Sequence, residues 1–324
     1  MFLRTRPTNA SRRGTGARRG ITPVEVLVVL FIGFVVLMIF SFSLPRMRER
    51  ARMAGCQRNL GQIGIALALY DRAEGTLPRV PTLNSPPDSL GGPLGTLLGA
   101  LAIPDLTGLS DPAKPPARRK SSPSGERTVP GFLCPSDINA ASNSGFPAPV
   151  SFRAVAGVSV SGLNGGFAPG RSVTLSEIEE SDGQAFTAAF SERLLGTGKD
   201  VPSKSRNYQV FKGPITAWGC PSDRSGTWKG DAGRSWAEAS WRSSLYHHAS
   251  RPNAAPSCVS DDGTAALMGA SSSHLAGVNL LYFDGSVRTV SPTISLPIWQ
   301  GMATTNGTLS GPPVLPPQAS EEPR

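Results

Sequence analysis

The sequence contains few of the residues on which enzymes and metal sites most often depend. Among 324 residues there are three histidines and four cysteines, and no two cysteines have the C-x-x-C spacing of a zinc or redox site. No G-x-S-x-G segment marks a hydrolase nucleophile. Charged residues make up 17% of the chain, which is too few for a coiled coil or a helical bundle. No catalytic or metal motif stands out, and we expect neither a metal nor a cofactor.

Glycine and proline are abundant instead. The chain has 36 glycines and 30 prolines, about a fifth of all residues, where roughly 12% is usual. Both interrupt helices, so the composition predicts an α+β fold with a β-rich, loop-rich head over residues 73–310. Within it, residues 111–127 are predicted to form a loop or insertion, and residues 311–324 a disordered tail. Strands are predicted at residues 151–159, 186–190, 208–211, 267–270, 278–283 and 286–290.

Positive charge is confined to the N-terminal end. Residues 1–20 contain six arginines and no acidic residue, whereas residues 59–324 carry 21 basic and 21 acidic side chains. A neutral body does not favour nucleic-acid binding. A basic leader before an apolar segment favours membrane targeting, with the N-terminus in the cytoplasm.

An uncharged run follows from Val26 to Pro45, long enough to cross a bilayer as a helix. Glu25 directly precedes this run, and its carboxylate is costly to place in lipid. A signal peptide that is cleaved off and discarded would have no use for such a residue. Apolar residues then recur at intervals of three and four, which indicates an amphipathic helix continuing to about residue 71. The members of this stripe are Met53, Cys56, Leu60, Ile63, Leu67 and Tyr70. The chain therefore divides into a leader (1–20), a membrane half (21–45) and an amphipathic half (46–72) of one long helix.

The junction Arg18-Arg19-Gly20, followed by I-T-P-V-E-V-L-V-V-L, resembles the N-terminus of type IV prepilins and type II secretion pseudopilins. The resemblance implies cleavage after Gly20 by a prepilin peptidase and methylation of the new terminal residue, Ile21. It also implies that Glu25 pairs with the terminal amine of a neighbouring pseudopilin-like subunit. Pairing of this kind would neutralise two charges held in lipid.

Three further segments resemble landmarks of planctomycete-type pseudopilin-like proteins, which join such an N-terminus to a large domain of unknown function. They are Phe132-Leu-Cys134-Pro-Ser-Asp137, Ser191-Glu192-Arg193 and the H-x9-D-G signature formed by His274, Asp284 and Gly285. The resemblance extends over residues 18–305 and does not supply a biochemical activity.

The H-x9-D-G signature lies at the last predicted hairpin. Asp284-Gly285 suits a two-residue type I′ turn, with positive φ at Gly285. We interpret His274 as structural, hydrogen-bonded to the Asp284 turn or to a backbone carbonyl. A catalytic arrangement of Ser272, His274 and Asp284 is the alternative, although no oxyanion loop supports it.

The four cysteines allow two disulfides with three possible connectivities in an exported chain. They are Cys56, Cys134, Cys220 and Cys258. Burial as a free thiol is equally compatible with the place of Cys56 on the helix stripe. Asp261-Asp262-Gly263 could offer oxygens to calcium but is far shorter than a calcium-binding loop.

These observations leave three functional hypotheses. The leading one is a single-pass protein of the bacterial inner membrane whose periplasmic head serves assembly or recognition in a type II secretion or type IV pilus-like system. The second is an anchored module that binds a solute or glycan, favoured if the tryptophans of residues 218–241 form an exposed concave face. The third and least favoured is an anchored hydrolase that uses His274.

Overall fold

The computed structural model describes residues 20, 22–82, 91–101, 127–142, 145–160, 164–215, 219–222, 225–254 and 256–306. The leader up to residue 19, Ile21, residues 111–126 of the predicted insertion and the tail from residue 311 lie outside the described residues. The chain forms two compact units, residues 1–48 and 49–324, which are described separately below. The fold is α+β, as predicted.

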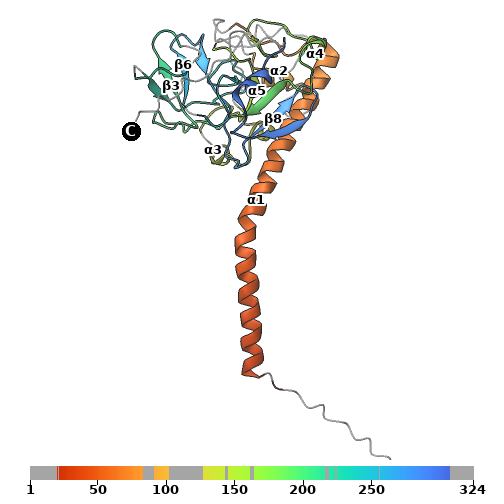
Figure 1. Cartoon of the computed structure of the whole chain (residues 1–324), viewed down its shortest axis with the longest axis vertical. Helices are drawn as coiled ribbons and strands as arrows, with labels where there is room; N and C mark the ends of the chain where they lie inside the picture. Colours follow the sequence, from red (N-terminus) through yellow and green to blue (C-terminus); the bar gives the residue numbers. More distant parts are fainter. Residues whose placement is uncertain are drawn as a thin grey trace, which may run out of the picture. The chain divides into compact units, whose positions relative to one another are not determined.

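Helix α1 (Pro23–Glu74) is by far the longest element (Figure 1). Its start is a capping box, in which the Thr22 hydroxyl accepts a hydrogen bond from the Glu25 amide while the Glu25 carboxylate accepts one from the Thr22 amide at 2.8 Å. Pro23 occupies the first turn, where its missing N–H costs nothing. Gly75, at φ +68°, ends the helix with a hydrogen bond from its amide to the Asp71 carbonyl at 2.7 Å.

In the first unit, the helix carries large apolar side chains that are exposed all round. Leu27, Leu30 and Leu37 are each at least two-thirds exposed, and the others from Val24 to Met38 are also exposed. In the part of the chain that the structure describes, no helix holds an apolar stretch long enough to cross a membrane. The side chains of residues 39–46, which complete the apolar run, lie outside that part.

In the second unit, the later half of α1, from Glu49 onward, packs on the head. Cys56, Leu60, Ile63 and Leu67 are buried in the largest core cluster, which confirms the predicted stripe. Gly64 allows close approach to the sheet, since a Cβ there would lie 2.8 Å from a methyl carbon of Leu281. Figure 1 shows this half of the helix beside strand β8.

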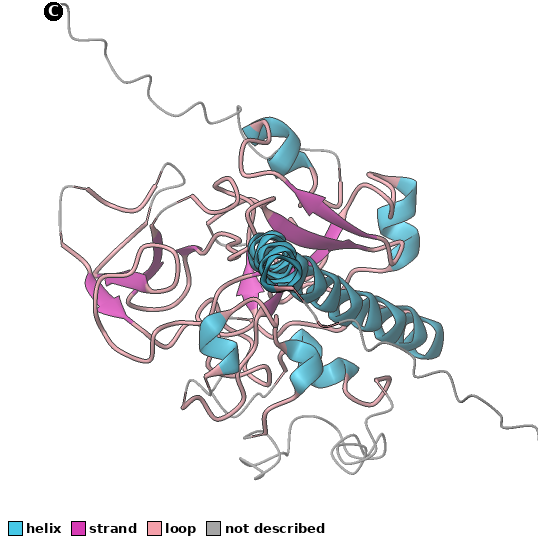
Figure 2. Cartoon of the chain, turned by 90° about the horizontal axis from the view of Figure 1, so that it is seen from below, coloured by secondary structure: helices cyan, strands magenta, loops and turns pink. Residues whose placement is uncertain are grey.

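The strands form two separate sheets (Figure 2). The five-stranded sheet has the order β5-β1-β2-β8-β9, and the four-stranded sheet has the order β4-β3-β6-β7. The strands are β1 (Phe152–Val155), β2 (Ala188–Glu192), β3 (Tyr208–Phe211), β4 (Thr227–Lys229), β5 (Leu245–Tyr246), β6 (Ser257–Ser260), β7 (Ala266–Leu267), β8 (Val278–Tyr282) and β9 (Val287–Val290). The other helices in the described part of the chain are α2 (Pro93–Leu97), η4 (Pro130–Phe132), α3 (Ile138–Ala141), α4 (Leu175–Glu180) and α5 (Leu296–Gly301). Five of the six predicted strands are present, mostly shorter than predicted, and β7 shares only Leu267 with the strand predicted at residues 267–270. Strands β4, β5 and β6 and helices η4, α3, α4 and α5 were not foreseen.

Strands β8 and β9 form the predicted antiparallel hairpin. Leu281 joins the core under α1, while Leu280 and Tyr282 join a second cluster with Trp299, so β8 is covered on both faces.

The turn of this hairpin differs from the prediction. The Gly285 amide donates to the Tyr282 carbonyl at 3.0 Å, and the Tyr282 amide to the Ser286 carbonyl at 2.9 Å, which is the pattern of a three-residue loop. Gly285 has φ +83°, as expected, but Asp284 is not in the positive-φ region that a type I′ turn requires at both central residues. Instead, the Asp284 carboxylate accepts a hydrogen bond from the Ser286 amide at 2.8 Å and braces the turn.

Candidate functional site

The candidate site is a buried cluster around His274, which the loop before β8 places beneath the later half of α1. The His274 side chain is 1% exposed, and its ring contacts two carboxylates. Nδ1 lies 2.8 Å from Glu49 Oε1 of α1, and Nε2 lies 3.2 Å from Glu192 Oε1 at the end of β2. Burial alone would lower the pKa of His274, but the hydrogen bonds to Glu192 and Glu49 outweigh burial and raise it. The ring therefore links the helix to the sheet through these two carboxylates.

Glu192 extends the cluster into the hairpin. Its carboxylate is buried and accepts hydrogen bonds from the Asn279 backbone amide at 3.0 Å and the Asn279 side-chain amide at 2.8 Å. The Asn279 side-chain oxygen in turn accepts from Gln57 on α1 at 3.2 Å and from Thr289 on β9 at 2.7 Å. Buried polar groups that are satisfied in this way fix one arrangement of their elements.

A disulfide between Cys56 of α1 and Cys134, in the loop after η4, joins the helix covalently to the rest of the head. Cys134 Sγ lies 3.6 Å from His274 Nε2, so the disulfide forms one wall of the cluster. Nearby, the Ser136 hydroxyl donates to Glu49 Oε1 at 3.0 Å, and the Asn59 side chain donates to the Leu133 carbonyl at 3.0 Å. Helix α1 is thus held to the head by one covalent bond and several buried polar contacts, which we call the helix clamp.

The donor atoms of the clamp do not suit a metal ion while the disulfide is intact. One donor atom each from Cys56, Cys134, Glu192 and His274 lie within 4.8 Å of one another. A cysteine ligates metal as a thiolate, and both sulfurs here are bonded to each other. Only one imidazole and one carboxylate remain from this group, and they bind each other.

The expected contact between His274 and the Asp284 turn is wrong. Both ring nitrogens of His274 are engaged by Glu49 and Glu192. His274 precedes β8 and Asp284 follows it, and a five-residue strand separates its ends by roughly 15 Å. For the same reason the two residues do not combine with Ser272 as a catalytic triad, and the Ser272 hydroxyl accepts a hydrogen bond from the His274 backbone amide instead.

The other predicted site residues lie apart from the clamp. Gly20 is exposed, Ile21 lies outside the described residues, and Glu25 forms the capping box with Thr22. Cys220 pairs with Cys258 in a second disulfide beside the four-stranded sheet.

Within the described residues, the tryptophans of the range 218–241 do not form the exposed face that would favour glycan binding. Trp236 and Trp241 are 3% and 1% exposed and belong to the main core. Trp228 is half-buried on β4, and Trp218 lies outside the described residues.

Sequence reasoning missed the carboxylates and amides that surround His274. Of these residues, only Glu192 stands in a segment that the sequence analysis singles out; Asn279, Glu49 and Gln57 do not. One available signal was the alternation along β8, which places the polar side chain of Asn279 opposite the face of Leu280. Another was the position of Gln57, which directly follows Cys56, a member of the buried stripe of α1.

The fold and the site together define an α+β head fixed to the end of a long N-terminal helix by a disulfide and a buried histidine–carboxylate cluster. The family model described as "Protein of unknown function (DUF1559)", also designated SBP_bac_10, matches residues 45–296. The match covers more than half of the chain, so the protein belongs to this family. No curated protein and no solved structure matches the chain.

Proposed function

We propose that the protein is a membrane-anchored pseudopilin-like subunit of the bacterial inner membrane, with its head in the periplasm. In this proposal a prepilin peptidase removes the leader after Gly20, and the head serves assembly or recognition in a type II secretion or type IV pilus-like system. The observation that carries the proposal is the contrast along α1. Its first part exposes apolar side chains, and its later part is clamped to the head.

The exposed part of α1 supports an anchoring role. Soluble monomers rarely expose contiguous apolar surface on this scale. Between residues 26 and 45 the sequence has no charged residue, so lipid or neighbouring helices are the surroundings that would cover these side chains at least cost.

Glu25 supports a role in assembly. In the isolated chain its carboxylate is bound by the amide and the hydroxyl of Thr22, two groups that lie directly beside the proposed new terminus. A methylated Ile21 amine of a neighbouring subunit offers the same carboxylate a charged partner, and charge-assisted hydrogen bonds are stronger than neutral ones. If Glu25 exchanged its hydrogen bonds with Thr22 for the terminal amine of the neighbouring subunit, the new contact would align the two helices.

The helix clamp supports a head in which the later half of α1, from Glu49 onward, is a fixed part. A subunit that assembles through its helix must keep this half attached to the rest of the head. The Cys56–Cys134 disulfide and the buried His274 contacts provide this connection.

The proposal is tested by photo-crosslinking in native membranes. A photoreactive amino acid at Leu30, which is 68% exposed, reports contacts between neighbouring helices. Glu25→Ala should leave membrane insertion intact, because a costly charge is removed, and should abolish crosslinks between subunits. Glu74→Ala, which removes an exposed carboxylate at the other end of α1, is the matched control and should crosslink normally. Unchanged crosslinking in Glu25→Ala would show that the helix is an anchor only.

A further inference from the structure

Two arginines lie inside the head without a carboxylate partner. Arg153 is in the middle of β1, and Arg193 directly follows β2; they are 0% and 2% exposed. Arg153 is opposite Ser191 in the antiparallel pair, so Arg193, two residues further along, points to the same face of the sheet. The two guanidinium groups therefore converge in one buried region.

Most of the hydrogen-bonding capacity of these guanidinium groups is unused. Arg153 donates from one nitrogen to the Trp241 carbonyl at 3.0 Å, and Arg193 from one nitrogen to the Gly269 carbonyl at 2.7 Å. The Nε and Nη2 atoms of both arginines are buried and have no protein partner. A guanidinium group has only donors, so these four nitrogens require acceptors.

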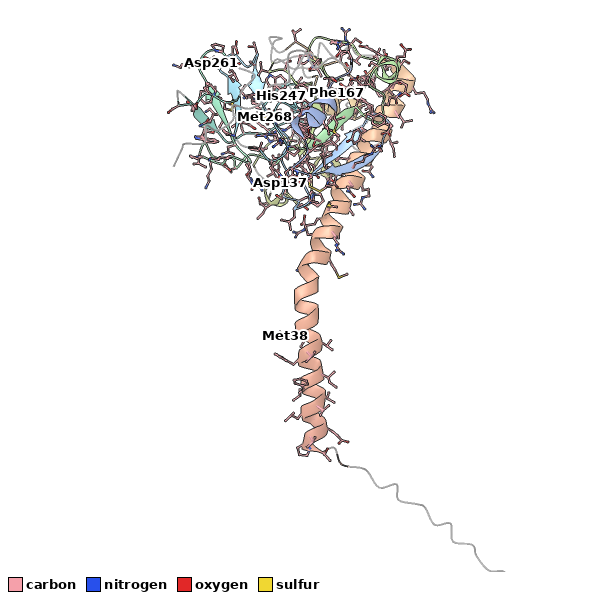
Figure 3. All side chains as sticks on the ribbon, in the orientation of Figure 1. Met38, Asp137, Phe167, His247, Asp261 and Met268 are labelled. Atoms are coloured by element: carbon pink, nitrogen blue, oxygen red, sulfur yellow. A yellow bond between two sulfur atoms is a disulfide. The ribbon has the colours of Figure 1, made fainter. Side chains whose placement is uncertain are left out.

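Further unpartnered polar atoms surround the two arginines. The Trp241 indole nitrogen and the His247 Nδ1 are both buried without a partner, and the two rings lie 5.4 Å apart. Ser151, whose carbonyl accepts from the Arg193 amide at 2.8 Å, also has a buried hydroxyl without a partner. His247 is labelled in Figure 3 next to Met268, and its Nε2 donates a hydrogen bond to the Ala266 carbonyl at 2.5 Å, which leaves Nδ1 as an acceptor in the neutral ring. We call this set the arginine cluster: Arg153, Arg193, Trp241, His247 and Ser151.

The cluster carries positive charge. Burial lowers the pKa of both arginines, to about 10 for Arg193, which leaves that group protonated at neutral pH. Asp231 acts on Arg153 electrostatically, but its carboxylate already accepts a hydrogen bond from the Tyr208 hydroxyl at 2.7 Å and lies 3.6 Å from Arg242. Buried guanidinium groups are costly unless a counter-charge and hydrogen-bond acceptors meet them.

A cavity of about 270 Å³ adjoins the cluster and opens to solvent. Its lining includes Trp241 and Tyr208, together with Ser240 and Arg242. Two carboxylates also line it: Glu238, which is bound by Arg242 at 2.7 Å, and Asp261, which accepts a hydrogen bond from the Gly213 amide at 3.3 Å. The cavity borders the cluster only at Trp241, whose indole nitrogen is itself buried.

We propose that the arginine cluster is a binding site for a small oxyanion of the carboxylate or phosphate type. Guanidinium groups bind both kinds of oxyanion through paired N–H donors. The indole N–H of Trp241 adds a further donor. The inference goes beyond the proposed anchoring role and does not depend on it, because every residue involved lies in the head.

The test uses the full-length chain in detergent and HEPES buffer at neutral pH. The midpoint of thermal unfolding is followed by tryptophan fluorescence while sodium phosphate or sodium acetate is added, with sodium chloride at equal ionic strength as the reference. We expect phosphate, acetate or both to raise the unfolding midpoint saturably above the chloride reference. A response to phosphate indicates a site for tetrahedral oxyanions, and a response to acetate indicates a site for carboxylates.

Variants show whether the response comes from the cluster. Arg193→Gln should weaken the apparent affinity at least 10-fold, and Trp241→Phe, which keeps most of the aromatic packing, should weaken it several-fold. Arg234→Gln, in an exposed arginine near Gly233, is the matched control and should respond like the wild type. If Arg193→Gln does not fold, Trp241→Phe and Arg193→Lys carry the test.

Two results would overturn the proposal. One is a wild-type midpoint that follows ionic strength alone with every anion up to 10 mM, which would mean that internal water satisfies the donors. The other is an unchanged anion response in both Arg193→Gln and Trp241→Phe.

Discussion

His274→Gln is the most informative perturbation of the helix clamp. The substitution removes a buried ring that bridges Glu49 on α1 and Glu192 on β2 at 2.8 and 3.2 Å. The Glu192 carboxylate would then stay buried, with the Asn279 donors but without its imidazole partner.

The expected magnitude follows from these contacts. Removing one partner of a buried ion pair costs about 3–5 kcal/mol. The Glu49 side of the contact is 37% exposed and contributes little. We therefore expect a loss near the lower end of that range, about 3 kcal/mol, or a fall in the unfolding midpoint of about 6–12 °C for a domain of this size.

The assay is thermal unfolding of the full-length chain in detergent, followed by near-ultraviolet circular dichroism. Glu49→Gln is the matched comparison, because it removes only the half-exposed contact and should cost about 1 kcal/mol or less. A His274→Gln protein that melts within 1 °C of the wild type would refute the view that His274 holds the helix to the head. Loss of a binding or hydrolytic activity without loss of stability would make His274 a functional site rather than a structural residue.

Three further predictions concern the same head. Cys134→Ala opens a loop of 78 residues and Cys258→Ala one of 38, so urea unfolding should show losses of about 4 kcal/mol each, slightly larger for Cys134→Ala; no loss for either would mean that the disulfides do not form. Gly277→Ala should destabilise the head more than Gly285→Ala, because both glycines have positive φ but only at Gly277 would a Cβ meet backbone, at 1.9 Å from a carbonyl oxygen; equal losses in the unfolding midpoint would contradict this. The raised pKa of His274 means that the contribution of its charge to stability is complete below about pH 6.5 and is lost as the pH rises through the folded-state pKa. The difference in unfolding midpoint between wild type and His274→Gln should therefore shrink from pH 6 to pH 9. A constant difference would show that the charge on the ring does not affect stability.

The parts of the fold that sequence reasoning predicted are those with a regular pattern. The stripe through Cys56, Leu60 and Ile63 predicted which face of α1 is buried, and the predicted end of the helix at about residue 71 lies close to its last residue, Glu74. The turn residues Asp284-Gly285 between two predicted strands predicted the β8–β9 hairpin. These signals are local, so the sequence of a single segment is enough to predict the element that it forms.

The elements that were missed depend on contacts between distant segments. Strand β5 has two residues and β4 has three, too short to show alternation, and both exist because they pair with β1 and β3. The error at His274 has the same origin. Asp284 was chosen as its partner for nearness in sequence, whereas Glu49 and Glu192 are 225 and 82 residues away and reach it only in the folded head.

The central claim, that the chain is a processed pseudopilin-like subunit, is tested most directly by mass spectrometry of its mature N-terminus from native membranes. The account predicts a first residue of Ile21 carrying an N-methyl group, because cleavage after Gly20 leaves Glu25 as the fifth residue of the mature chain. A chain that begins at Met1, or at Leu44 as after cleavage of an ordinary signal peptide, would contradict it.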